Sequence, residues 1–266
     1  MLSRNIVLFG IFLVALGLGC AGLLCAWVPG SSFPLVAGNV LMAFGILAHG
    51  AWLWGWKRCL LFFGISAGLT FLLEALSLGT GLATPYYYTA VLGPRFLGVP
   101  LVIPLGWFSM LYLSHVVVNL LVEGRPECGR HGHGRMLFLA FLTALVMSSW
   151  DLTLDPFMVQ TMKAWVWLQP GGFLGIPFAN YVSWLELTFI ICLCYRVAER
   201  GQPELPRQAR SRLLVGLPVG LYGLIGLSGC FAGLSGGLGV LPPFTMGIAT
   251  LGALGRLAQM GEGGEA

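Results

Sequence analysis

The stretch MLFLAFLTALVMSSWDLTLDPF (residues 136–157) joins a long apolar run to two aspartates, Asp151 and Asp155. They are the only aspartates in a chain of 266 residues that is 57% hydrophobic and 9% charged. Apolar runs of about 18 residues or more are typical of helices that cross the hydrocarbon core of a bilayer. Several such runs and a mean hydropathy of +0.86 exclude an ordinary soluble domain. The sequence therefore predicts an all-α, polytopic membrane protein.

The apolar runs predict eight spans within a single integral-membrane domain, residues 1–266. Their expected ranges are about 6–28, 33–55, 59–80, 98–122, 136–154, 175–198, 212–232 and 238–258. The last two spans carry no acid, histidine or asparagine, so we expect residues 212–258 to be scaffold. Residues 59–198, which include spans three to six, are the expected functional core.

Basic residues predict the orientation, because Lys and Arg gather on the cytoplasmic side of membrane proteins. With the N-terminus inside, all 14 Lys and Arg residues lie on the cytoplasmic side except Arg95 and Lys163. Both termini are then cytoplasmic, in a multi-pass protein of the cell membrane. The net charge of +4 reflects this asymmetry, and we expect no nucleic-acid partner.

The two long outer loops, 84–100 and 155–177, are rich in aromatic residues and weakly charged. Such segments belong at the membrane interface or folded into the protein. Asp155 followed by Pro156 has the composition of a helix N-terminus, so we expect the preceding span to end there and a short helix to cover about 156–168. In a cytoplasmic loop, His131 and His133 are interpreted as surface residues, and no metal site is expected.

Four carboxyl groups fall in or beside the spans, at similar depth in the outer half: Glu74, Asp151, Asp155 and Glu186. The other acids are assigned to loops or to the C-terminal tail, namely Glu123, Glu127, Glu199, Glu204, Glu262 and Glu265. An ionisable group at membrane depth is costly and is expected to face protein or a water-filled cavity. These four are therefore the candidate catalytic residues.

Polar side chains at helical spacing accompany the acids and predict an interior seam between helices. The expected stripes are Ser66, Thr70, Glu74 and Ser77; Ser109, Tyr112, His115 and Asn119; and Asn180, Ser183 and Glu186. Such groups also stabilise helix pairs by bonding to one another, and His115 is interpreted as one such structural partner. Close helix packing is expected at Ser66–Gly68 and in the glycine-rich stretch 216–239.

This arrangement has a chemical interpretation. A carboxyl group in apolar surroundings resists ionisation and can act as a general acid, while a second, wetter one can orient or deprotonate water. Aromatic faces stabilise a cation. The candidate substrate-binding residues are Tyr86, Tyr87, Tyr88, Trp107, Trp150, Trp165, Trp167, Asn180, Tyr181 and Trp184. Together these groups suit acid-catalysed addition of water to an alkene, although the same groups also suit holding a pigment or a lipid.

Two segments resemble the integral-membrane carotenoid hydratases, which include bacterial γ-carotene 1′,2′-hydratases and archaeal bisanhydrobacterioruberin hydratases. They are EALSLGTGLATPYYYTAVLGPRFLGVPLVIPLGWF (74–108) and WDLTLDPFMVQTMKAWVWLQPGGFLGIPFANYVSW (150–184). The most specific features are Asp155-Pro156, the Trp-x-Trp at 165–167 and the run GIPFANYVSW at 175–184. The chain departs from the family at Ser183, where the family usually has Gly, and at Phe173-Leu174, where it usually has an aromatic pair.

The resemblance implies hydration of a terminal ψ-end double bond in a linear or monocyclic carotenoid, giving a tertiary alcohol without a cofactor. Our hypothesis assigns the proton to Asp151 or Glu186 and the water to Asp155 or Glu74. The substrate would enter from the lipid phase. Membrane lipids and other enzymes of carotenoid synthesis are the further expected partners.

Two other classes remain open from the sequence. DLTLD (151–155) has the D-x-x-x-D spacing of membrane prenyltransferases, which hold Mg²⁺ and diphosphate, but a second aspartate cluster is missing. Retention of activity in EDTA would favour hydration. A non-catalytic carotenoid- or lipid-binding subunit would use the aromatic loops and would keep its pigment after loss of the carboxylates.

Overall fold

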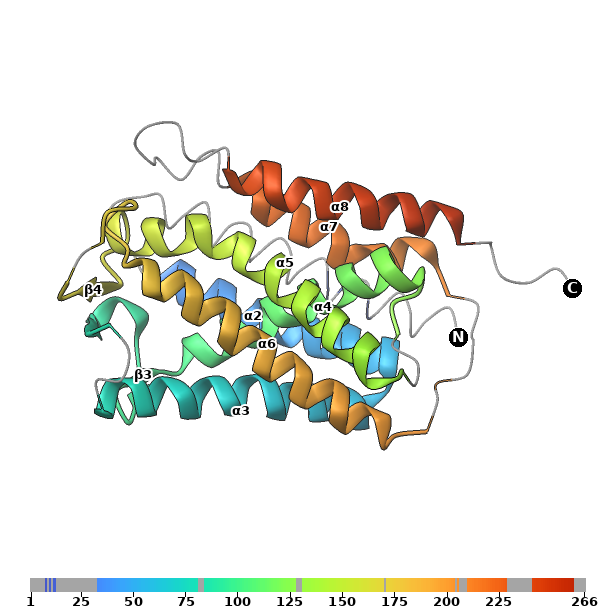
Figure 1. Ribbon diagram of the computed structural model, residues 1–266, viewed down its shortest axis with the longest axis horizontal. Coiled ribbons are helices and arrows are strands. Elements are labelled where there is room, and N and C mark those ends of the chain that lie inside the picture. Colours follow the sequence, from blue (N-terminus) through green and yellow to red (C-terminus); the bar gives the residue numbers. More distant parts are fainter. Residues whose placement is uncertain are drawn as a thin grey trace, which may run out of the picture.

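The computed structural model describes residues 33–80, 84–127, 131–169, 171–203, 210–228 and 241–260, with the single residues 8, 10, 12 and 205. Almost all of the first expected span lies outside the described residues. The described helices are α2 (Phe33–Trp54), α3 (Trp56–Thr80), α4 (Val102–Glu123), α5 (His133–Gln160), α6 (Phe178–Arg200), α7 (Arg212–Ser228) and α8 (Leu241–Gln259). They form one elongated bundle (Figure 1).

The helices α2 to α6 are each long and apolar enough to cross a membrane, which supports a polytopic α-helical membrane protein. The helices α7 and α8 coincide with the last two expected spans, but α7 has only 17 residues. The count of eight spans and the cytoplasmic position of both termini stay predictions.

Helix α4 is the centre of the bundle. It packs against α2, α3, α5, α7 and α8, and most of its side chains are buried. The expected stripe Ser109, Tyr112, His115 and Asn119 is fully buried, so the interior seam is confirmed for this helix. The ring nitrogens of His115 have no hydrogen-bond partner among the described residues. The expectation that His115 is a hydrogen-bond partner is wrong, because its ring packs against Trp54, Phe62 and Tyr195 instead.

Two short antiparallel sheets cover one end of the bundle (Figure 1). Strand β1 (Tyr86–Tyr88) pairs with β4 (Trp165–Trp167), so that Tyr86 faces Trp167 and Tyr88 faces Trp165. Strands β2 (Arg95–Phe96) and β3 (Val99–Pro100) form a hairpin. Its turn residues Leu97 and Gly98 both have positive φ, the conformation that a two-residue type I′ turn requires. The two aromatic loops are thus folded into the protein and joined to each other.

The predicted helix over 156–168 is wrong. Helix α5 continues through Asp155 and Pro156 to Gln160, and residues 165–167 form β4. Proline lacks an N–H and clashes with the preceding turn inside a helix, but here the burial of Phe157 and Met158 continues the helix past it. Asp155 therefore lies in the last turns of α5, and its side chain is buried instead of capping a new helix.

Small residues bring α7 and α8 together, as expected for the described part of the glycine-rich stretch. A Cβ at Gly216 would stand 2.6 Å from Leu257, and one at Gly223 would stand 2.8 Å from Thr250. No described residue of another element lies within 4 Å of a Cβ built at Gly68. The expectation of close packing at Gly68 is therefore wrong for the part of the chain that the structure describes.

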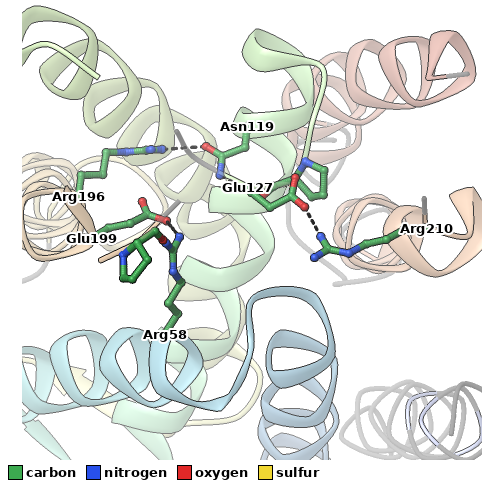
Figure 2. Close-up of polar contacts among 8 residues, drawn as sticks. Arg58, Asn119, Glu127, Arg196, Glu199 and Arg210 are labelled. Atoms are coloured by element: carbon green, nitrogen blue, oxygen red, sulfur yellow. Dashed lines mark hydrogen bonds and ion pairs between the residues drawn. The ribbon is translucent and has the colours of Figure 1, made fainter. Parts of the chain in front are cut away.

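The opposite end of the bundle is held by buried charged groups (Figure 2). Arg58 of α3 pairs with Glu199 of α6 at 3.3 Å and also donates to the carbonyl of Pro203. Arg196 of α6 donates to Oδ1 of Asn119 on α4 at 3.1 Å. Glu199, expected in a loop, instead lies in α6 and is only 7% exposed, since its ion pair offsets part of the cost of burial.

A second ion pair at this end joins Arg210, beside α7, to Glu127, beside α4. Figure 2 shows it next to the Arg196–Asn119 contact. The loops at this end are therefore tied to the helices by charged groups, whereas the end with the strands contains a cavity.

Candidate functional site

A cavity of about 210 Å³ lies at the end of the bundle that carries the strands. Side chains from α2 to α7 and from the strands β1 and β4 line it. It is smaller than the roughly 300–1,000 Å³ of pockets that enclose a drug-sized ligand. The cavity therefore suits one end of a long molecule.

Asp155 is the carboxyl group that α5 presents to this cavity, and it is 1% exposed. The indole N–H of Trp165 donates to its Oδ1 at 2.6 Å. The side-chain amide of Asn180, on α6, donates to its Oδ2. Each oxygen of Asp155 thus accepts one N–H bond, which fixes the carboxylate between β4 and α6 as an acceptor.

Asp151 lies one helical turn before Asp155 and is fully buried, but it does not line the cavity. Its Oδ2 is 3.4 Å from the amide nitrogen of Asn180, and its Oδ1 has no hydrogen-bond partner among the described residues. The two aspartates therefore share one amide donor. Of the two, only Asp155 lines the cavity.

Glu74 of α3 faces the same cavity and is held by two tyrosines of β1. The hydroxyls of Tyr86 and Tyr88 both donate to its Oε2, the second at 2.9 Å. Burial, reinforced by the neighbouring Glu74 carboxyl, raises the pKa of Tyr86 and of Tyr88 above the usual tyrosine range. Both hydroxyls therefore remain hydrogen-bond donors at neutral pH, and both donate to the same oxygen of Glu74.

Aromatic rings form much of the cavity wall. Trp107 and Trp184 stack with their centroids 4.3 Å apart, and Trp150 meets Trp184 edge to face. The pairing of β1 with β4 places Tyr86 against Trp167, 4.9 Å between centroids. Aromatic faces stabilise positive charge, and here they line the same cavity as the two carboxyl groups.

Most of the candidate residues meet at this cavity. Its lining includes Glu74, Tyr86, Tyr88, Trp107, Trp150, Asp155, Trp165, Trp167, Asn180 and Trp184. Four candidates lie elsewhere. Asp151 is buried but does not line the cavity. Tyr87 is 50% exposed on the other side of β1, and Tyr181 packs against Phe173. Glu186 is exposed on the outer face of α6.

Asn39 of α2 is a cavity residue that the sequence reasoning did not single out. Its Oδ1 is buried and has no hydrogen-bond partner among the described residues. It lies so close to Gly106 that a Cβ there would be 3.2 Å from its Nδ2. The signal was present, because Asn39 is the only asparagine in the apolar run 33–55.

Two carboxyl groups, an open cavity and a wall of aromatic rings can support proton transfer to and from an apolar ligand. The fold and the site together define a polytopic α-helical membrane protein with a carboxylate-bearing, aromatic-walled cavity. The model of the carotenoid biosynthesis protein family matches residues 30–254, and the chain belongs to that family. No curated protein and no solved structure matches it.

Proposed function

We propose that this protein is a carotenoid hydratase, which adds water to a terminal ψ-end double bond of a linear or monocyclic carotenoid and yields a tertiary alcohol. The observation that carries the proposal is that Asp155 and Glu74 face one aromatic-walled cavity. Membership of the carotenoid biosynthesis protein family supports the substrate class. The resemblance of residues 74–108 and 150–184 to carotenoid hydratases supports the reaction.

Our mechanism takes the proton donor from the acids that line the cavity, and so uses Glu74 and Asp155 rather than Asp151 or Glu186. Glu74 takes this role in our mechanism. It lines the cavity, and because both tyrosines donate to its Oε2, we assign the proton to Oε1. Asp155, with both oxygens accepting N–H bonds, is the acceptor for a proton from water. The two tasks are thus separated between α3 and α5.

The reaction balances without a cofactor. Glu74 gives its proton to C2′, the π electrons form the new C–H bond, and a tertiary cation remains at C1′. Water attacks C1′ as Asp155 takes its proton, and return of that proton to Glu74 restores the starting state. The tryptophans of the cavity wall stabilise the cation.

Asp151 acts in this mechanism as a positioning residue. It shares the amide of Asn180 with Asp155, so it influences where that amide lies. Its replacement by asparagine keeps the volume, removes the ionisable group and turns one acceptor oxygen into an amide donor. We expect a smaller loss of rate for Asp151→Asn than for Asp155→Asn.

A carotenoid would reach the cavity from lipid with its end group first. The cavity volume of about 210 Å³ fits an end group and leaves the rest of a C40 chain among the helices and the lipid. Trp107 and Trp184 form the apolar wall for that end group.

The test is pigment analysis in a host that accumulates lycopene and γ-carotene. The wild-type chain is expected to yield a pigment heavier by one water. Asp155→Asn and Glu74→Gln are expected to lower its yield about a hundredfold or more, the usual contribution of a general acid or base. Glu186→Gln is the matched control, since it alters an acid outside the cavity, and should leave the yield unchanged.

Two results would contradict the proposal. Unchanged pigments beside a well-expressed wild-type protein would favour a non-catalytic carotenoid-binding subunit, for which the same aromatic cavity would serve. A hydrated pigment at normal yield in Asp155→Asn would remove Asp155 from the mechanism.

A further inference from the structure

Glu186 lies on the side of α6 that faces away from the bundle. Exposed residues of this helix recur every three or four positions and form one face, here called the α6 outer face. It consists of Ala179, Val182, Glu186, Ile190, Cys194 and Val197. The opposite face, with Trp184, Thr188 and Tyr195, is buried against α5 and α3. Figure 1 shows α6 running across the front of the bundle.

The depth of Glu186 makes this exposure costly. It follows the first residue of α6, Phe178, by eight positions, which corresponds to about 12 Å along a helix. Glu186 has no hydrogen bond or ion pair within the described part of the chain. A charged group facing hydrocarbon costs up to about 2.5–3.5 kcal/mol on insertion scales, the value at the bilayer centre, and such groups almost always face protein or water.

We propose that the α6 outer face is the interface between two copies of this chain, paired through Glu186. Two copies inserted in the same orientation are related by a two-fold axis along the membrane normal. Their α6 helices then run parallel, and each residue of the α6 outer face meets its own counterpart at the same depth. Glu186 therefore faces a second Glu186.

Carboxyl groups are suited to this kind of self-pairing. A carboxyl that carries a proton donates one hydrogen bond and accepts others, so two of them satisfy each other across the axis. In an isologous interface the same surface of both subunits meets itself, so its polar groups have to be self-complementary. A different partner would have to bring its own polar group to the same depth, whereas a second copy supplies it automatically.

The rest of the α6 outer face is compatible with helix packing. Val182, Ile190 and Val197 are 38%, 48% and 55% exposed and provide an apolar surface on both sides of Glu186. In a membrane, association of helices depends on packing and interhelical hydrogen bonds. The α6 outer face offers both.

Cys194 provides a native probe for this interface. It is exposed and lies two turns beyond Glu186 on the same face, so the two-fold axis brings both copies of Cys194 near each other. The purified full-length chain is reconstituted in vesicles at low density, treated with a flexible bismaleimide and separated by mass. In parallel, single-molecule step counting on a fluorescent fusion measures how many chains travel together.

The wild-type chain is expected to give a cross-linked dimer and two-step bleaching, and Cys194→Ser to lose the cross-link alone. Glu186→Gln, whose amide also donates and accepts, is expected to keep the dimer. Glu186→Leu is expected to weaken dimerisation about tenfold, the equivalent of one interhelical hydrogen bond. The melting temperature of Glu186→Leu checks its folding. It should not fall, because a leucine side chain is favourable in the hydrocarbon core.

Single-step bleaching of the wild-type chain would overturn the proposal. So would a dimer that Glu186→Leu leaves at full strength, since the pairing would then run through another surface.

Discussion

Trp165 donates its indole N–H to Oδ1 of Asp155 at 2.6 Å, and this bond joins strand β4 to the end of α5. Trp165→Phe would keep the aromatic ring and remove the donor. A hydrogen bond to a charged group contributes about 1.5–3 kcal/mol, so its loss is expected to slow hydration about tenfold or more. The measurement is the yield of hydrated carotenoid per unit of folded protein.

The control for this variant is Trp56→Phe, the same replacement at a tryptophan that is 57% exposed and starts α3 at the other end of the bundle. Its activity should match that of the wild type. Equal losses in both variants would mean that the indole N–H of Trp165 has no specific role.

The three consecutive tyrosines of β1 offer a second test. Side chains alternate along a strand, so Tyr86 and Tyr88 reach Glu74 whereas Tyr87 is exposed. Tyr86→Phe and Tyr88→Phe should each lower the rate of hydration several-fold, because each removes one donor to the proposed acid. Tyr87→Phe is the matched neighbour and should have no effect; if it slowed the reaction equally, the role of the Glu74 contacts would be refuted.

Much of the fold was predictable because apolar run length is a local signal. The helices α2, α3, α4 and α6 agree with the expected spans to within about four residues, within the usual uncertainty of such boundaries. The pairing of β1 with β4 was not predictable, because it joins residues about 80 positions apart and depends on tertiary contacts. The continuation of α5 through Pro156 has the same origin.

The position of Glu186 shows a different limit. Depth in the membrane does not tell which way a side chain points. A helix turns about 100° per residue, so Glu186, six positions after Asn180, points well away from it. Trp184, four positions after Asn180, points nearly the same way and does line the cavity. With Asn180 as the reference direction, the sequence alone would have predicted that Trp184 points to the cavity and Glu186 away from it.

The buried ion pair between Arg58 and Glu199 (Figure 2) is a matter of stability. Arg58→Met would leave Glu199 buried without its partner, which is expected to cost about 3–5 kcal/mol. The combined variant Arg58→Met, Glu199→Leu should recover most of this loss, because no unpaired charge remains. Unfolding in a mild detergent, followed by circular dichroism, measures the difference.

Arg135→Met is the surface control for that experiment. Arg135 pairs with Glu123 at 2.8 Å, but its side chain is 42% exposed, and exposed ion pairs contribute about 0–1 kcal/mol. If Arg58→Met lowered the free energy of unfolding no more than Arg135→Met, the buried ion pair would contribute no more to stability than the exposed one.

The tyrosines beside Glu74 also predict how stability depends on pH. Because burial raises the pKa of Tyr86 and Tyr88, the folded state favours their hydroxyl form. Their contribution is fully present below the unfolded pKa of about 10 and is lost as the pH rises above it. The melting temperature of the wild type should therefore fall more steeply between about pH 9 and pH 11 than that of the double variant Tyr86→Phe, Tyr88→Phe. The melting temperature of Tyr87→Phe, which changes an exposed tyrosine, should depend on pH as that of the wild type does. If the melting temperature of the double variant fell just as steeply, other groups would govern the alkaline transition.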